Sequence, residues 1–244
     1  MRVQSEGEQQ SDADIFLFVP KRKLPEGDSG SQGLPRLPPG RHGLPREFVV
    51  QNQRDRLVAG IIAAVATSGY HDATISEIAA AAGVSRRTFY TYFSSKEECF
   101  LATYDVIAKH LAAAAADAAI PDQPWPERVR AKIGAALAFF AANPDLVRFY
   151  LSAPPRAGEA IAARYRLGAA RVLADLTDGM PDQVRQPPPS VQNAMTGSIA
   201  ALIVRKVEAG EGERLTDLLP DLVELFLTPY LGHEAAAEAA RVAS

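Results

Sequence analysis

The sequence predicts an all-helical protein with an N-terminal three-helix domain, built on a helix-turn-helix, followed by a larger helical domain. Three observations support this fold class. The stretch 74–96 carries two helix-start signals around a glycine helix stop. Apolar residues recur at intervals of three and four along most of the remaining chain. With 244 residues and 47% apolar content, the chain can bury one large core or two modest ones.

The stretch 74–96 predicts two short helices joined by a tight turn. Thr74 and Glu77 have the spacing of a capping box, which satisfies the first backbone N–H groups of a helix. Gly83 supplies the left-handed residue that ends this helix, and Ser85 is the N-cap of the next one. Helices joined so closely must cross steeply. This geometry is the helix-turn-helix, whose second helix can enter a DNA major groove.

The second helix of the motif has an unusual surface for a soluble protein. Phe89 and Phe93 lie four residues apart and are predicted to face the core. The residues left facing outward can donate to guanine edges and phosphates: Arg86, Arg87, Thr88, Tyr90, Thr91 and Tyr92. An ordinary solvated helix start is the alternative for the Ser/Arg/Thr cluster taken alone, but the capping and spacing of the whole stretch favour a DNA-reading helix.

Residues 83–97, with the sequence G-V-S-R-R-T-F-Y-T-Y-F-S-S-K-E, follow A-T-I-S-E-I-A at 73–79. Together they resemble the DNA-binding signature of the TetR-type (TetR/AcrR) transcriptional regulators. In that family a three-helix DNA-binding head is joined to a helical domain that binds a small molecule and dimerises. The resemblance implies base-facing positions for Arg86, Arg87 and Tyr90. It implies phosphate contacts for Thr88, Thr91, Tyr92 and Lys96. Ser76 matches a position that touches DNA in some members, and Ser85 is a further candidate DNA-binding residue.

The net charge of −3 is distributed unevenly along the chain. Residues 20–46 contain six Lys/Arg and two Asp/Glu, a net charge of +4, among repeated Leu-Pro and Pro-Gly pairs. We therefore predict a flexible basic arm over residues 1–46. Arg41 and Arg46 are candidates for minor-groove contacts, and a passive tail is the alternative, favoured for residues 1–30.

The head is predicted over residues 47–95. A helix from Glu47 to Ser68 carries apolar residues such as Leu57 and Ile61 on one face, and Gly69 is its stop. A connecting helix over 96–118 begins the second domain, which extends to residue 244. Its alanine-rich end suits either a signal relay or an ordinary packing helix.

The second domain offers candidate effector-binding and dimer-forming residues. An apolar and aromatic set suggests a small apolar or aromatic effector, although each member also fits an ordinary core: Phe139, Phe140, Phe149, Tyr150, Tyr165, Asn193 and Met195. A helix over 189–209 has a face of small residues, and a helix from Thr216 to Pro229 is more apolar than one buried stripe requires. This pair predicts a four-helix homodimer interface at Ala194, Gly197, Ala201, Leu218, Leu222 and Phe226.

Other function classes find little support in the sequence. The single cysteine, Cys99, excludes an internal disulfide, and the four histidines lack ligand spacing, so we expect no metal and no cofactor. No nucleophile elbow or phosphate-binding glycine loop argues for an enzyme. We expect no membrane span and a cytoplasmic location.

The predicted function is a ligand-responsive regulator that binds a double-stranded DNA operator as a homodimer. We expect it to be a repressor released by its small-molecule effector. The alternatives are a helical scaffold and, less favoured, a small-molecule-binding enzyme. The sequence leaves open the effector, the operator, whether the protein represses or activates, and whether the arm contacts DNA.

Overall fold

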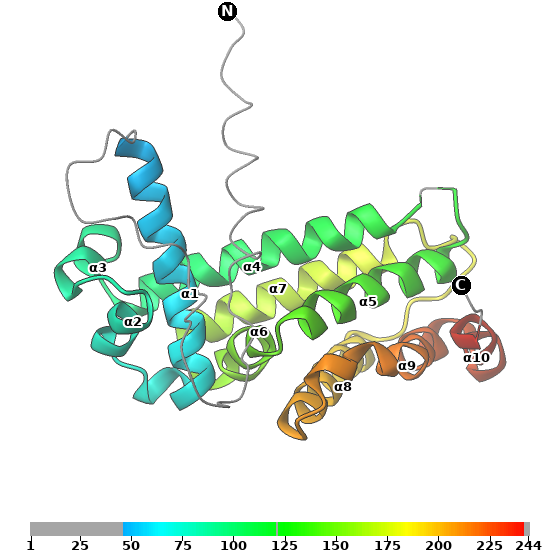
Figure 1. Ribbon diagram of the computed structural model, residues 1–244. Coiled ribbons are helices and arrows are strands. Elements are labelled where there is room, and N and C mark those ends of the chain that lie inside the picture. Colours follow the sequence, from blue (N-terminus) through cyan, green and yellow to red (C-terminus); the bar gives the residue numbers. More distant parts are fainter. Residues whose placement is uncertain (1–45, 121, 242–244) are drawn as a thin grey trace, which may run out of the picture. The chain divides into compact units, whose positions relative to one another are not determined.

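The computed structural model of the protein describes residues 46–120 and 122–241, with side chains from Asn52 onward. The regular elements in these ranges are all helices, without a strand, which confirms the predicted fold class (Figure 1). Two compact units divide the chain between Val106 and Ile107. The predicted arm and the contact assigned to Arg41 lie outside the described residues. Arg46 begins the first helix, but its side chain is also outside them.

The first unit contains the three helices of the predicted head and the first turns of a fourth. These are α1 (Arg46–Asp72), α2 (Ile75–Ala81), α3 (Arg86–Tyr92) and the start of α4 (Lys96–Ala118). Gly69, with φ of 79°, interrupts α1, so its regular part ends at Ser68 as predicted. The core of this unit is formed by fully buried side chains that include Leu57, Ile61, Ile78, Phe89 and Phe100.

The predicted helix starts in this unit are confirmed. Thr74 Oγ1 accepts from the Glu77 N–H at 3.2 Å, and the Thr74 N–H donates to the Glu77 carboxylate at 2.8 Å. Hydrogen bonds from Thr74 hold the pKa of Glu77 below its usual range. Ser85 Oγ accepts from the Thr88 N–H at 3.0 Å, and Gly83 has φ of 62°. The chain therefore turns from α2 into α3 as the caps specify.

The second unit begins within α4, whereas the sequence predicts that all of this helix belongs to the second domain. The reason is that the first turns of α4 belong to the head: the Phe100 and Tyr70 rings meet edge to face at 5.1 Å. The other elements of the second unit follow in order: α5 (Trp125–Ala142), α6 (Asp145–Val147), η2 (Arg148–Ser152), η3 (Pro154–Arg156), α7 (Glu159–Thr177), α8 (Pro189–Glu208), η4 (Gly212–Leu218), α9 (Leu219–Leu231) and α10 (His233–Arg241).

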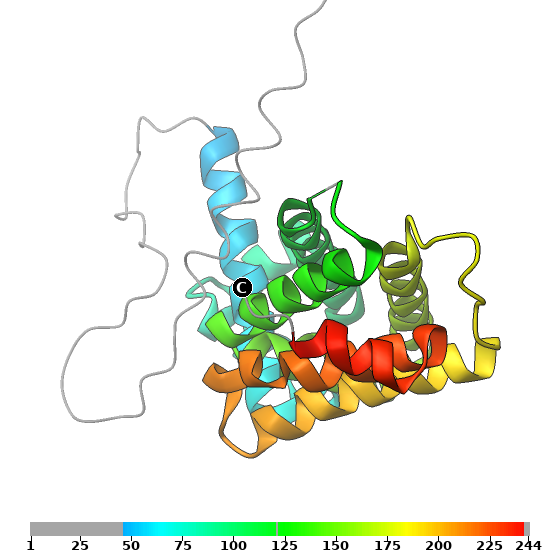
Figure 2. The ribbon, with the colours of Figure 1, turned by 90° about the vertical axis from the view of Figure 1, so that its right-hand side faces the viewer.

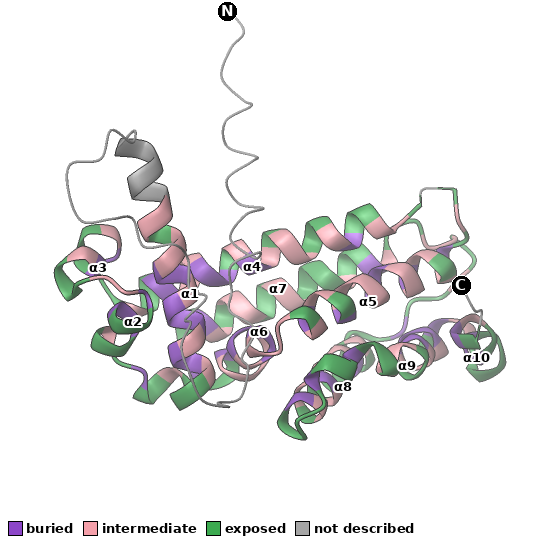
Figure 3. Ribbon diagram, in the orientation of Figure 1, coloured by how far each residue is buried: buried purple, intermediate pink, exposed green. Residues whose placement is uncertain are grey.

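The helix predicted from Thr216 to Pro229 differs from the observed elements. A 3₁₀ helix, η4, occupies its first part, and α9 continues past Pro229 to Leu231. Helices α5, α8 and α10 all contact α9, and α8 to α10 lie together in both views (Figures 1 and 2). Leu222 and Phe226 consequently have no exposed surface. The prediction that they form a dimer interface is wrong for this structure, because they are buried in the interior of the second unit. Figure 3 shows buried residues along α9.

Helix α4 bears on the expectation that the chain has no membrane span. It is the one helix of the described ranges that is long and apolar enough, by length and composition, to cross a membrane. This feature is weak evidence for a span, since the mean hydropathy of its apolar window is 1.2 and 28% of that window is buried. Much of that hydropathy comes from alanine, and charged residues such as Lys96, Asp105 and Lys109 recur along the helix. A membrane span is predominantly apolar throughout, so we interpret α4 as the connecting helix.

Candidate nucleic-acid interface

Helix α3 presents most of its polar residues to solvent. Arg86, Arg87, Tyr90 and Thr91 are exposed, and Phe89 is fully buried on the opposite side. Ser76 on α2 and the cap Ser85 are exposed as well, whereas Thr88 is half-buried beside its hydrogen bond to Ser85. The predicted DNA-binding residues of α2, the turn and α3 are therefore accessible, with Thr88 the least so.

The two arginines of α3 are available for a ligand. Among the described residues, no ion pair or hydrogen bond engages either guanidinium group. Tyr90 is 50% exposed, and its ring packs edge to face on Phe89 with 5.5 Å between centroids. A guanidinium at the start of a groove-entering helix can make a bidentate pair with guanine. The exposed face of α3 therefore combines two donors for base edges with an aromatic ring.

Thr91 and Tyr92 are engaged within the head. Thr91 Oγ1 donates to the Arg87 carbonyl at 3.1 Å. The Tyr92 hydroxyl donates to Gln53 Oε1 of α1 at 2.8 Å. Each hydroxyl oxygen can still accept a hydrogen bond, but the hydrogen bonds that the two hydroxyls donate stabilise the head itself. The sequence did not indicate these two bonds.

Lys96 lies at the first position of α4, and its side chain points into the head. Its ammonium donates to the carbonyl oxygens of Tyr70, His71 and Ala73 at 2.6, 3.2 and 2.8 Å. The same nitrogen lies 4.5 Å from the centroid of the Tyr70 ring. Burial lowers the pKa of Lys96, and Asp72 and Glu77 oppose this effect. The structure therefore directs Lys96 to backbone carbonyls, and the predicted phosphate contact does not fit this geometry.

Two further residues of α1 position the motif and were missed in the sequence. Arg56 donates to the Gly83 carbonyl at 2.6 Å and so fixes the turn between α2 and α3. Gly60 lies against α2 so closely that a Cβ atom there would be 2.6 Å from the Ile78 carbonyl oxygen. The sequence feature that could have indicated them is their position at the edge of the apolar stripe that contains Leu57, because helix–helix contacts begin at such an edge.

Comparison with known families agrees with this geometry. Residues 57–103 match the model of the family described as bacterial regulatory proteins, tetR family. The chain carries the DNA-binding domain of the TetR family. The match covers the second half of α1, all of α2 and α3 and the start of α4. The match spans 47 of the 244 residues and therefore concerns the head.

Solved structures with a similar fold cover most of this chain. The fatty acid degradation regulator FadR from Bacillus halodurans gives a TM-score of 0.62 at 18% identity, over 72% of this chain and 93% of that one. A TetR family regulator from Marinobacter aquaeolei VT8 gives 0.57 at 22% identity, over 72% and 97%. FadR from Bacillus subtilis, solved in complex with stearoyl-CoA, gives 0.57 at 16%, over 72% and 97%. No curated protein matches the chain.

The predicted effector-binding residues come together only in part. The rings of Phe140 and Tyr150 lie 6.1 Å apart, and those of Phe139 and Phe140 lie 5.6 Å apart. Phe149 and Tyr150 belong to the short π-helix η2 and are buried. The rings of Phe139, Phe140 and Tyr150 form an aromatic cluster between α5 and η2, and Phe149 is the neighbour of Tyr150 in η2. Helix η2 in turn contacts α8.

The remaining predicted lining residues are placed differently. Met195 is buried on α8, but Asn193 is exposed. Residues two apart on a helix face opposite sides, so the prediction that both line one pocket is wrong. Tyr165 on α7 is half-buried, and this burial raises the pKa of its hydroxyl.

A surface pocket of about 480 Å³ lies elsewhere in the second unit. The end of α7 and the loop after it form its walls, including Thr177, Gly179 and Asp182. None of the predicted lining residues contributes to it. We assign it no function, because its walls are short loop segments open to solvent.

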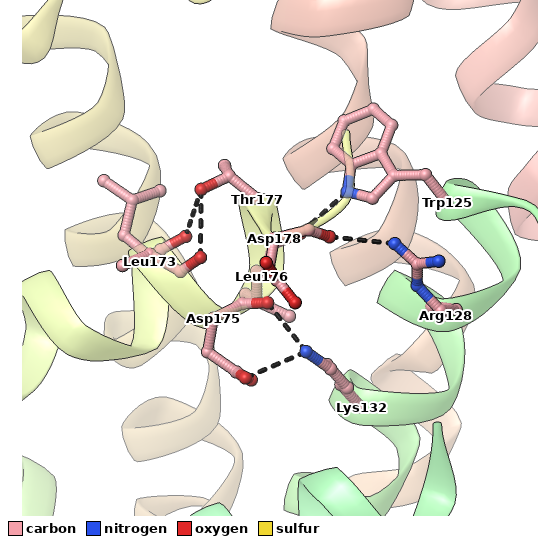
Figure 4. A network of polar contacts seen from close by, with 9 residues as sticks. Trp125, Arg128, Lys132, Leu173, Asp175, Leu176, Thr177 and Asp178 are labelled. Atoms are coloured by element: carbon pink, nitrogen blue, oxygen red, sulfur yellow. Dashed lines mark hydrogen bonds and ion pairs between the residues drawn. The ribbon is translucent and has the colours of Figure 1, made fainter. Parts of the chain in front are cut away.

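The chain next to this pocket is held by a network of polar contacts between α5 and α7 (Figure 4). Trp125 Nε1 donates to the Leu176 carbonyl at 2.8 Å, and Arg128 donates to the Asp178 carbonyl at 2.9 Å. Lys132 donates to the Asp175 carbonyl at 2.7 Å and to its carboxylate at 2.9 Å. These donors satisfy carbonyl groups at the end of α7, which lack partners within the helix. The network thus fixes α7 on α5.

The predicted dimer residues of α8 remain exposed, in contrast to those of α9. Ala194, Gly197 and Ala201 all lie on the solvent side of α8, and Leu218 in η4 is half-buried. Nothing lies within 4 Å of a Cβ atom built on Gly197. The small-residue face that the sequence predicts is therefore accessible on the surface of the second unit.

Cys99 is a free cysteine in the head. Cys99 is fully buried, and burial raises its pKa to about 12. The described residues contain no group of three or more His, Cys, Asp or Glu that could hold a metal ion.

Proposed function

We propose that the protein is a ligand-responsive repressor that binds a double-stranded DNA operator through α2 and α3. The observation that carries this proposal is the exposed face of α3. Its two arginines have no partner among the described residues, while the rest of the head is fixed by Arg56, Tyr92 and Lys96. A helical scaffold would have no use for such a surface, and an enzyme would need a reactive site that this face lacks.

The test is selection of bound duplexes from a randomised DNA library by the purified protein. Arg86→Ala and Arg87→Ala should each change or relax the selected sequence. Arg171→Ala, which removes an exposed arginine of α7, is the matched control and should leave it unchanged. Failure of the unaltered protein to enrich any sequence would reject sequence-selective binding.

For the effector we propose an apolar or aromatic small molecule that binds next to the aromatic cluster of α5 and η2. The cluster supports this chemistry because it brings together three aromatic side chains from α5 and the π-helix η2, and π-helices are frequent at functional sites. A long acyl chain is one member of this class, and the similar fold of a FadR solved with stearoyl-CoA makes acyl-CoA the first series to test. Release of the selected duplex by an acyl-CoA of one chain-length range would support the proposal, and indifference to all chain lengths would favour another apolar ligand.

We also propose that the protein acts as a cytoplasmic homodimer whose contact surface includes Ala194, Gly197 and Ala201 of α8. Small residues let two helices approach closely, and these three are exposed in the single chain. Two heads related by a two-fold axis would bind two half-sites. Sedimentation of a monomer at micromolar concentration would reject this arrangement.

A further inference from the structure

The three carbonyl groups that accept from Lys96 form the corner between α1 and α2. Gly69 interrupts α1, and the chain then passes through Tyr70, His71 and Ala73 before α2 begins at Ile75. Carbonyl groups at such a helix end have no partner within the helix. Ala73 is 1% exposed, so water would reach its carbonyl oxygen poorly if the Lys96 donor were removed.

The ammonium group of Lys96 matches this corner in number and shape. It has three N–H donors, and three carbonyl oxygens lie within 3.2 Å of it. The Tyr70 ring covers the same nitrogen at 4.5 Å. All three protons therefore have acceptors in the protein, so none remains for a DNA phosphate without breaking one of these bonds.

The corner also determines where the DNA-binding surface lies. Helix α2 starts two residues after Ala73, carries Ser76, and leads into α3 through a turn held by Arg56. Because Lys96 is the first residue of α4, its three hydrogen bonds tie the start of the connecting helix to the start of α2.

We propose that Lys96 is a positioning residue for DNA recognition, which holds the α1–α2 corner on the first turn of α4, and that it makes no phosphate contact. The expected effect on DNA affinity rests on the proposed function, whereas the three hydrogen bonds of Lys96 do not depend on it. Without the clamp, α2 and α3 hold the required arrangement for only a fraction of the time. The affinity for the selected duplex falls to that fraction of its original value, whereas binding to unrelated DNA through mobile phosphate contacts changes little.

The experiment compares full-length Lys96→Gln and Lys96→Arg with the unaltered protein. Arg171→Gln removes an exposed positive charge from α7 and serves as the charge control. Amide hydrogen exchange of the segment 69–75 is measured without DNA. Affinities for the selected duplex and for a scrambled duplex are then measured over a range of salt concentrations.

We expect the backbone amides of segment 69–75 to exchange faster in both Lys96 variants. Both variants should also bind the selected duplex about fivefold to tenfold more weakly, because the fraction of molecules with α2 and α3 in the binding arrangement falls by that factor. The salt dependence should not change, and the ratio of selected to scrambled affinity should fall. Arginine should not rescue, because its planar guanidinium cannot direct three protons to these carbonyls. Arg171→Gln should match the unaltered protein.

The opposite results would overturn the inference. A phosphate contact predicts unchanged exchange at 69–75, rescue by arginine, and a salt slope reduced by about 0.9 in Lys96→Gln. Failure of both variants to fold would support the clamp, because a phosphate contact has no role in the protein alone. If the unaltered protein selected no duplex, the proposed function would fail, and the exchange measurement would still decide whether the clamp exists.

Discussion

The close approach of α1 and α2 at Gly60 leads to a quantitative prediction for Gly60→Ala. A Cβ atom on Gly60 would lie 2.6 Å from the Ile78 carbonyl oxygen, 2.9 Å from the Ala82 nitrogen and 3.0 Å from the Ala82 Cβ. Two of these atoms are backbone, so relief requires α2 to move away from α1. Overpacking of this kind costs about 1–3 kcal/mol.

A glycine-to-alanine change also has a favourable part. Alanine stabilises a helix interior by about 0.5–1 kcal/mol relative to glycine. The balance for Gly60→Ala is a destabilisation of the head by about 0.5–2 kcal/mol. Because α2 moves, binding to the selected duplex should weaken as well. Hydrogen exchange of peptides from α1 and α2 measures the local change in the free energy of unfolding.

Gly134→Ala in α5 is the matched control. There the added Cβ would meet only the two Leu219 methyl groups, at 3.5 and 3.8 Å, which are ordinary contacts. This variant should be more stable by about 0.5–1 kcal/mol. Urea unfolding followed by the fluorescence of Trp125, the only tryptophan of the chain, reports on the same unit. If Gly60→Ala stabilised the head as much as Gly134→Ala stabilises the second unit, the close contact between α1 and α2 would be disproved.

Four shorter predictions concern other parts of the chain. Alanine at Arg86 or Arg87 should cost about 1–3 kcal/mol of discrimination at one position of each half-site in competition binding, and an unchanged preference in both would make them phosphate contacts. Deletion of residues 1–45 should reduce the salt slope of DNA binding by about 0.9 for each phosphate that the arm neutralises, and an unchanged slope would make the arm passive. Cys99, with a pKa of about 12, should resist maleimide until the head unfolds, and rapid labelling would contradict its burial. Ala201→Glu on exposed α8 should dissociate the dimer in sedimentation while the helical content persists, and an intact dimer would exclude this face.

The sequence predicted the head well because its signals are local. The capping pair Thr74 and Glu77, the turn at Gly83 and the stop at Gly69 each act within a few residues, and all are found in the structure. The same reasoning failed for Lys96. Its acceptors lie 23 to 26 residues away, and no local pattern indicates that a lysine at a helix start will turn inward.

The second unit shows where apolar periodicity alone is insufficient. The apolar stripe of α5 is buried at Val129, Ile133, Leu137 and Phe140. On α7, by contrast, Val172 belongs to a similar stripe and is 42% exposed. Spacing reports that a helix has an apolar face, but whether a neighbour covers that face depends on tertiary packing. Candidate effector residues are limited in the same way, because a pocket and a core use the same side chains.

The excess apolar surface of α9 had two possible explanations, a partner subunit or a central position within the chain. The structure supports the second, because α10 lies on α9 and buries Ala236, Ala237 and Ala240. Exposed positions at the ends of α9, such as Asp221 and Pro229, offer little apolar surface to another subunit. A dimer would therefore be centred on the small-residue face of α8, where helices can approach closely without large side chains. On this reasoning a charge at Ala201 tests association, whereas a charge at Leu222 would test only folding.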